Sequence, residues 1–229
     1  MSTSEESQQF LDDENYRVTY LVGASGTAIL AFGGVGLALG GIQVEEFRKS
    51  LGSRNTIFFL TDKHRSWWNN GDILQVIERI VSFASKELNV TTLAAVGNSM
   101  GGSGALLAAH YFSEITRGLS LVPQGDVRTQ YWIETRWLPY RRKIRSFKFK
   151  NFALLPRSSD FHILFGDRSD TWQKRIFRGH DIELRILRGY DHRLAAVAKI
   201  QRPAFYRSMI DFVTDGVPIN FDTSDLPKS

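Results

Sequence analysis

Residues 92 to 104 constrain the fold of this chain more than any other stretch, and they read TLAAVGNSMGGSG. An apolar run of the kind that forms a buried strand leads directly into glycines on either side of Ser99, and small and apolar residues follow. This order predicts a strand, a sharp turn and a helix. Glycine at positions 97 and 101 would let the strand and the helix approach each other closely around the serine.

Apolar runs and amphipathic stretches alternate through the rest of the chain. Besides the strand at 93–96, the pattern predicts strands at 16–22, 28–32, 56–60, 118–122, 161–165 and 182–187. Apolar residues at helical spacing predict helices at 44–51, 73–88 and 194–213. Because strands that alternate with helices pair side by side through right-handed crossovers, we expect an α/β fold with a mostly parallel sheet and helices on both faces.

The chain has 229 residues, of which 42% are hydrophobic, enough for one sizeable core. We therefore expect a single domain over residues 1–229, with its core at about 16–213. Residues 124–159 interrupt the alternation and predict a small basic insertion, not a separate domain. The chain contains no cysteine, which excludes disulfides, a thiol nucleophile and cysteine metal ligands.

The first fifteen residues are acidic and polar, without the basic and then apolar layout of a signal peptide. The longest apolar stretch, 27–42, is shorter than a membrane span and rich in glycine. We expect no transmembrane segment, and a cytoplasmic location.

The G-x-S-x-G turn at 97–101, between an expected strand and an expected helix, resembles the nucleophile elbow of the α/β-hydrolase superfamily. The resemblance covers about residues 16–213 and implies that Ser99 is a nucleophile, followed in the chain by an acid and then a histidine. It also implies that the insertion at 124–159 is a small cap over the active site. A structural serine in a glycine-rich turn is the alternative. A phosphate-binding loop fits less well, because no lysine follows the glycines.

The resemblance places the acid after the strand expected at 161–165, where Asp167 and Asp170 compete. Family members commonly have the acid three residues after such a glycine, and Ser169 holds that position here, so the match is imperfect. We favour Asp170 because it lies further into the loop, with Asp167 as the alternative. Either aspartate could also cap a turn or a helix.

His192 follows the last expected strand and is therefore the candidate general base. The other histidines fit this position less well: His64, His110, His162 and His180. In such a triad the imidazole takes the proton of the serine as it attacks, and the carboxylate orients the imidazole. This chemistry requires no metal and no cofactor.

The resemblance also implies an oxyanion hole formed by backbone amides. One would be that of Met100, and the second that of Gly34 or Val35, in a glycine-rich loop after the strand at 28–32. A tight turn or a helix start is the alternative interpretation of this loop. A dinucleotide-binding loop is not favoured, because the spacing of the glycines is wrong.

Two features predict substrate contacts. Trp67 and Trp68 follow the strand at 56–60 and would either line the pocket or pack under the insertion. Residues 136–150 carry seven basic and no acidic side chains, interleaved with aromatic residues. We expect Arg141 and Arg142 to attract an anionic substrate. A solvated segment whose aromatic residues pack inward is an equal alternative; a membrane surface is a further one, and nucleic acid is not favoured.

These features together predict a serine hydrolase that cleaves an ester or thioester through an acyl-enzyme. An acyltransferase or a peptidase could use the same triad. An idle fold that binds a ligand or partner is the alternative from another class. The sequence indicates neither the substrate nor the oligomeric state.

Overall fold

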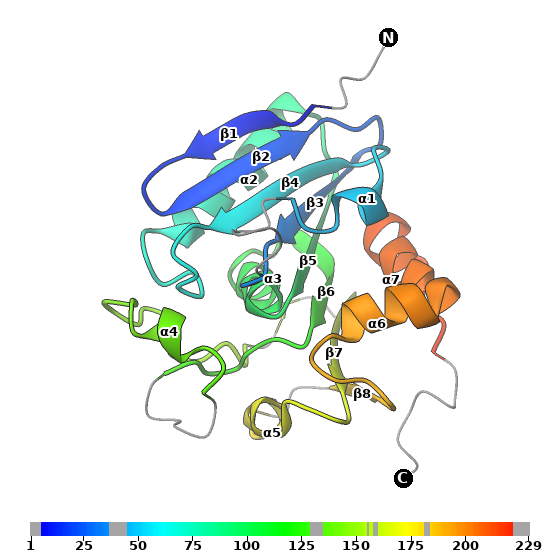
Figure 1. The fold of residues 1–229 in the computed structure, drawn as a ribbon. Helices are drawn as coiled ribbons and strands as arrows, with labels where there is room; N and C mark the ends of the chain where they lie inside the picture. Colours follow the sequence, from blue (N-terminus) through cyan, green and yellow to red (C-terminus); the bar gives the residue numbers. More distant parts are fainter. Residues whose placement is uncertain are drawn as a thin grey trace.

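A single sheet of eight strands organises the molecule, in the order β1-β2-β4-β3-β5-β6-β7-β8 (Figure 1). The computed structural model describes residues 6–36, 45–128, 135–154, 156–157, 160–180 and 184–221. Its strands are β1 Gln8–Asp12, β2 Tyr16–Leu21, β3 Thr27–Phe32, β4 Thr56–Asp62, β5 Thr92–Asn98, β6 Ile115–Leu121, β7 Asp160–Gly166 and β8 Arg185–Leu187. The β1–β2 and β2–β4 pairs are antiparallel, and every other pair is parallel.

Side chains of the central strands alternate between two apolar layers, because successive residues of a strand point to opposite faces. In β3, Ala28, Leu30 and Phe32 belong to one layer. Ile29 and Ala31 belong to the other. Burial on both faces explains why these strands appear in the sequence as continuous apolar runs.

Helices cover both faces of the sheet (Figure 1). The helices are α1 Arg48–Leu51, α2 Ile73–Glu87, α3 Met100–Tyr111, α4 Leu138–Arg141, α5 Thr171–Arg178, α6 Leu194–Gln201 and α7 Pro203–Asp215. Apolar residues of α2 and most of those of α3 join the layer that contains Phe32. Apolar residues of α1, α6 and α7 join the opposite layer. The α/β class, with a mostly parallel sheet and helices on both faces, is thus confirmed.

The structure differs from the expected elements in several places. The helices α4 and α5 were not expected, and the strand expected at 182–187, of which residues 182–183 lie outside the described residues, is Arg185–Leu187. The helix expected at 194–213 is two helices, α6 and α7, separated at Arg202. Pro203 begins α7, and a proline cannot donate the backbone hydrogen bond that would continue α6. The strand β1 was not expected, because its polar sequence suits an edge strand that is half exposed. Of the helix expected at 44–51, residue 44 lies outside the described residues, and α1 occupies only Arg48–Leu51.

The parallel strands end at a common edge of the sheet, which positions the loops that follow them. Phe32 at the end of β3 pairs with Gly97 in β5, and Leu121 at the end of β6 pairs with Asn98. Gly166 at the end of β7 pairs with Leu187, the last residue of β8. The residues predicted to be catalytic or to stabilise the oxyanion all follow these strand ends, so the fold brings their loops together.

None of the described helices is both long and apolar enough to cross a membrane. The cytoplasmic location stays a prediction, as does the division into one domain with a small insertion at 124–159.

Candidate active site

Ser99 lies at a sharp turn between β5 and α3, with the left-handed backbone angles φ 56° and ψ −121°. The flanking glycines permit this turn. A Cβ atom on Gly97 would lie 2.0 Å from the carbonyl oxygen of Gly101, and one on Gly101 would lie 2.0 Å from that of Phe32. No other residue fits at either position, and the strained turn presents the serine hydroxyl beyond the end of the sheet.

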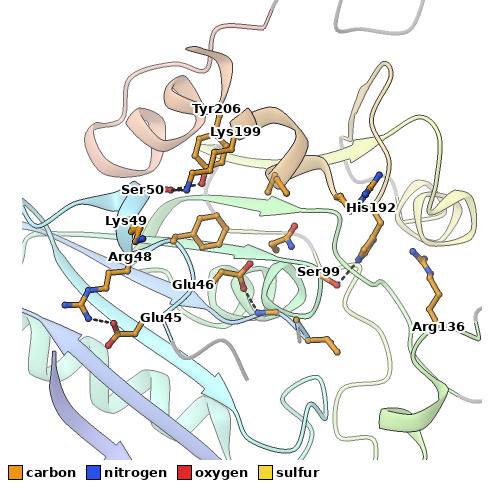
Figure 2. A pocket seen from close by; sticks show the side chains of 18 of the residues that line it. Glu45, Glu46, Arg48, Lys49, Ser50, Ser99, Arg136, His192, Lys199 and Tyr206 are labelled. Carbon is orange, nitrogen blue, oxygen red and sulfur yellow. Dashed lines mark hydrogen bonds and ion pairs between the residues drawn. The ribbon is translucent and has the colours of Figure 1, made fainter. Parts of the chain in front are cut away.

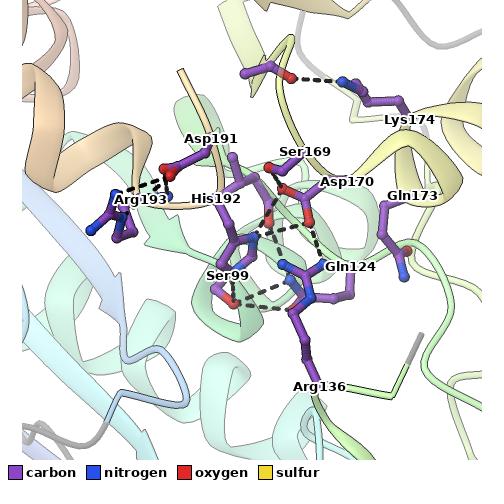
Figure 3. Close-up of polar contacts among 12 residues, drawn as sticks. Ser99, Gln124, Arg136, Ser169, Asp170, Gln173, Lys174, Asp191, His192 and Arg193 are labelled. Carbon is purple, nitrogen blue, oxygen red and sulfur yellow. Dashed lines mark hydrogen bonds and ion pairs between the residues drawn. The ribbon is translucent and has the colours of Figure 1, made fainter. Parts of the chain in front are cut away.

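His192 connects Ser99 to Asp170 (Figure 3). Its Nε2 atom is 3.0 Å from Ser99 Oγ, and its Nδ1 atom is 3.1 Å from each carboxylate oxygen of Asp170. Ser99 and Asp170 are buried, and the His192 side chain is 19% exposed. Three residues that lie up to 93 positions apart in the chain are thus in a continuous hydrogen-bonded line.

The carboxylate of Asp170 has partners besides His192. Ser169 Oγ donates to it at 2.6 Å, and so does Arg136 Nη2, also at 2.6 Å. Burial alone would raise the pKa of Asp170, but the hydrogen bond and charge of His192, with the hydrogen bonds from Ser169 and Arg136, lower it well below its usual value. Asp170 is therefore a carboxylate throughout the neutral range, able to orient the imidazole and stabilise its protonated form.

Asp167, the other candidate acid, lies apart from His192. It is exposed, and its Oδ1 atom accepts a hydrogen bond of 2.7 Å from the backbone N–H of Gly189. This contact joins the loop after β7 to the loop that carries His192. The geometry therefore gives Asp167 a part in holding the two loops together, and brings only Asp170 to the histidine.

Gln124 is a site residue that the sequence analysis did not identify. Its Nε2 atom lies 3.1 Å from Ser99 Oγ, and its Oε1 atom accepts a hydrogen bond of 2.9 Å from Trp67 Nε1. The second contact orients the amide, because an indole N–H can only donate. Gln124 follows the end of β6, which neighbours β5, so its place in the chain could have indicated that it lies near Ser99. The sequence could not indicate the direction of its side chain.

Of the two alternatives for Trp67 and Trp68, packing under the insertion fits the structure and lining the pocket does not: the Trp67 ring lies 5.9 Å from the Trp137 ring, and neither tryptophan lines the pocket. Both are completely buried, and Trp68 Nε1 donates to the carbonyl oxygen of Met100 at 3.0 Å. The buried carboxylate of Asp62 accepts hydrogen bonds from the backbone N–H groups of Ser66 and Trp68, which folds the loop inward. Trp68 therefore supports the turn at Ser99 through Met100, and Trp67 supports the side chain of Gln124.

The expected oxyanion donors differ in availability. Met100 begins α3, where a backbone N–H has no partner within the helix. The N–H of Gly34, in contrast, donates to Glu46 Oε2 at 2.6 Å. Burial raises the pKa of Glu46 to about 7, against the lowering effect of this hydrogen bond. Val35 is buried and lines the pocket beside Gly34.

A cavity of about 940 Å³ opens beside the triad (Figure 2). Ser99 and His192 line it at one side, and Arg136, Trp137 and Tyr140 contribute from the 124–159 insertion. The Trp137 ring lies 5.4 Å from the His192 ring. The opposite side is formed by residues of α1, α6 and α7.

Arg141 and Arg142, expected to bind substrate, are not among the residues that line this cavity. Arg141 is buried, and Nη1 donates to the carbonyl oxygen of Arg128 at 3.5 Å. Arg142 is exposed. The aromatic residues of the segment pack against the core, as the alternative of a solvated segment expected: Trp137, Tyr140, Phe147 and Phe149. Of the seven basic side chains at 136–150, only Arg136 lines the cavity.

Within the described parts of the chain, no group of three or more histidine, aspartate or glutamate side chains could hold a metal ion. The polar groups at the site instead place a hydroxyl, an imidazole and a carboxylate in hydrogen-bonded order, an arrangement that suits attack on a carbonyl carbon.

No protein-family model matches the sequence, and no curated protein sequence matches it either. Solved structures do resemble it. A capsule O-acetyltransferase of Neisseria meningitidis serogroup A is 18% identical, with a TM-score of 0.59 and coverage of 90% of this chain and 93% of that one. An esterase of Pyrococcus furiosus is 10% identical, with a TM-score of 0.62 and coverage of 94% and 91%.

An acylaminoacyl peptidase of Pyrococcus horikoshii is also 10% identical, with a TM-score of 0.61 and coverage of 95% of this chain but 42% of that one. These similar structures are α/β-hydrolase-type proteins, and the likeness shows that this chain has the α/β-hydrolase fold.

Proposed function

We propose that this α/β-hydrolase-fold protein is a serine hydrolase that cleaves an ester or thioester through a covalent acyl-enzyme. The observation that carries the proposal is the position of His192, within hydrogen-bond distance of both Ser99 Oγ and the Asp170 carboxylate. An isolated serine is a poor nucleophile, and a base oriented by a carboxylate is what activates it.

The reaction follows from these contacts. Ser99 Oγ attacks the carbonyl carbon of the substrate while its proton moves to His192 Nε2. The imidazolium, stabilised by Asp170, returns that proton to the leaving oxygen or sulfur as its bond to carbon breaks. Water then attacks the carbonyl carbon of the acyl-enzyme and gives a proton to His192. His192 passes that proton to Ser99 Oγ as the bond between Oγ and carbon breaks, which releases the acid and the free serine.

The negative charge that develops on the carbonyl oxygen requires donors. The N–H of Met100 suits this role because it begins α3 directly after the nucleophile. The loop after β3 would supply the second donor. Since Gly34 donates to Glu46, Val35 is the better candidate for the second donor while that contact is in place.

Transfer of the acyl group to an alcohol is a second candidate. It is favoured by the likeness to an O-acetyltransferase and by a cavity large enough for an acceptor beside Ser99. An acyl-enzyme serves both reactions, and only the acceptor differs. Cleavage of a peptide bond by the same triad is a weaker alternative, because the similar peptidase is matched over less than half of its length.

Burst kinetics with p-nitrophenyl acetate test the proposal. Wild-type protein should release a burst of nitrophenolate equal to its own concentration, followed by slower turnover. Ser99→Ala should abolish the burst and lower kcat by roughly 10³-fold or more. Ser113→Ala removes an exposed serine outside the cavity and should change nothing. Full activity of Ser99→Ala would refute the proposal. Added alcohols that divert the acyl group from water would favour the transferase.

A further inference from the structure

The cavity has a second polar region on the side formed by α1, α6 and α7. Lys49 and Ser50 of α1, Lys199 of α6 and Tyr206 of α7 line it together, and we refer to these four residues as the lysine wall. In Figure 2 the lysine wall and the Ser99–His192 pair lie on opposite sides of Glu46. A molecule that extends across the cavity from the serine would therefore meet the lysine wall.

Hydrogen bonds join three members of the lysine wall. Lys199 Nζ donates to Ser50 Oγ at 3.3 Å, and Ser50 Oγ lies 2.9 Å from the Tyr206 hydroxyl oxygen. The Lys199 ammonium also lies 5.7 Å from the centre of the Tyr206 ring. Burial raises the pKa of Tyr206, so its hydroxyl keeps its proton at neutral pH. An ammonium and two hydroxyls from three separate helices thus converge on one part of the cavity.

The charges of the cavity are unevenly neutralised. Each arginine that lines it contacts a carboxylate: Arg48 with Glu45, Arg136 with Asp170, and Arg193 with Asp191. Lys49 and Lys199, in contrast, have no carboxylate partner among the described residues. The positive charge that remains available in the cavity is therefore concentrated at the lysine wall.

Ammonium groups beside hydroxyl donors suit one class of ligand, an anionic oxygen group such as a carboxylate or a phosphate. A position nearer the serine is less suitable for such a group. The Glu46 carboxylate, which lies between the lysine wall and the Ser99–His192 pair and accepts the Gly34 N–H, would repel a second anion beside it. The charges thus impose a direction on an anionic ligand, with its charged end away from the serine.

Apolar side chains also line the cavity. Two come from the residues directly before α1 and α4, and two come from α6: Phe47, Trp137, Ala195 and Ala196. They would contact a hydrocarbon segment that joins a carbonyl group at Ser99 to an anionic group at the lysine wall.

We propose that the lysine wall is a subsite for the anionic end group, carboxylate or phosphate, of an ester substrate whose scissile carbonyl lies at Ser99. The inference rests on the proposed hydrolase function and deepens it, by naming the class of substrate. It also moves the recognition of negative charge from the 136–150 segment, where Arg141 and Arg142 lie away from the cavity, to α1 and α6.

Three p-nitrophenyl esters of equal chain length test this subsite. One acyl chain ends in a carboxylate, one in a phosphonate, and one in a neutral dimethylamide. For each anionic ester we take the ratio of its kcat/KM to that of the neutral ester. In the variant Lys49→Gln/Lys199→Gln this ratio should fall about three- to tenfold, since two exposed charges are lost. The size of the fall for each anionic ester shows which of the two groups the subsite prefers.

The matched control is Lys143→Gln/Lys150→Gln, which removes the same net charge at two exposed positions outside the cavity. Its ratio should equal that of wild type. Higher salt should lower the wild-type ratio and barely change that of Lys49→Gln/Lys199→Gln. An equal fall in both double variants, or no fall in either, would overturn the subsite while leaving the hydrolase function intact.

Failure of the hydrolase function is separable. If wild-type protein cleaves none of the three esters, titration calorimetry can measure binding at the subsite with three matching compounds in which an amide bond replaces the ester. The compounds that end in a carboxylate or a phosphonate should bind more tightly than the compound with the neutral end. Loss of this difference in Lys49→Gln/Lys199→Gln would support the subsite without catalysis. Equal binding by both proteins would reject it.

Discussion

The two ends of the cavity are built in different ways. At the triad, Ser99, His192 and Asp170 are held by hydrogen bonds, and each follows the end of a parallel strand. At the lysine wall, Lys49 and Lys199 are exposed on helices and contact at most neutral groups. Under the proposed function, the sheet would preorganise the reacting groups, whereas adaptable side chains on the surrounding helices would recognise the substrate.

The largest effect should come from the acid of the triad. Asp170→Asn should lower kcat by about 10²- to 10⁴-fold, because an amide favours the wrong tautomer of the imidazole. Asp167→Asn is the matched control, since its carboxylate contacts the Gly189 N–H and not His192. It should lower kcat by less than about tenfold. Steady-state kinetics with p-nitrophenyl acetate measure both, and the reverse order would show that the preorganised line of hydrogen bonds does not run through Asp170.

An intermediate effect is expected for the contacts that support the serine. Gln124→Ala should lower kcat by about fivefold, because a hydrogen bond to Ser99 Oγ is worth roughly 1 kcal/mol. It should also lower the free energy of unfolding by about 1–3 kcal/mol, since it leaves the buried Trp67 N–H without a partner.

Trp67→Phe separates the two consequences, because it removes that N–H and leaves the Gln124 amide in place. Urea unfolding and kinetics of the two variants would show whether the support acts on stability, on turnover or on both. If Gln124→Ala left both quantities unchanged, rigidity at the triad end would not depend on this contact.

The smallest effect concerns Glu46, which lies between the two ends. Its pKa of about 7 means that it gains a negative charge as the pH rises through neutrality, beside the loop that would stabilise the oxyanion. Glu46→Gln keeps an acceptor for the Gly34 N–H but removes the charge. We expect the variant to exceed wild type severalfold in kcat/KM at about pH 8 and to match it at about pH 6.

The same group affects stability, with a definite sign. The folded-state pKa of Glu46 lies above its usual value, so the folded state binds more protons between the two values. The free energy of unfolding of wild type should therefore fall as the pH rises from about 4.5 to about 7, and that of Glu46→Gln should fall less. Urea unfolding of both proteins at several pH values checks this, and identical pH profiles would show that Glu46 is not buried enough to be perturbed.

The same contrast explains how much could be predicted from the sequence. Local patterns in the sequence predict the turn and the strands. Glycine positions predict the turn at Ser99, and apolar runs predict the strands of the parallel sheet, including those before Asp170 and His192. The resemblance to the α/β-hydrolase superfamily then indicated which loops carry the acid and the histidine, with Asp167 left as an alternative to Asp170. The structure brings Ser99, Asp170 and His192 together. Their catalytic roles stay proposals until they are measured.

What could not be predicted depends on the direction of single side chains. The tryptophans at 67 and 68 occupy a loop at the right edge, yet the loop folds inward around Asp62 and buries both rings. The basic segment 136–150 contains many charges, but only Arg136 lines the cavity. The lysine wall joins residues up to 157 positions apart, from Lys49 to Tyr206, and no periodic pattern marks such a set.

The mass of the protein after exposure to a fluorophosphonate tests the proposed nucleophile most directly. We expect a single phosphonyl adduct, located by peptide mapping to Ser99, in wild type and in Lys49→Gln/Lys199→Gln alike. We also expect His192→Ala, when folded, to react at least about 10³-fold more slowly, because the base that activates the serine is missing. An adduct on another residue, or equal labelling of His192→Ala, would rule out the proposed mechanism.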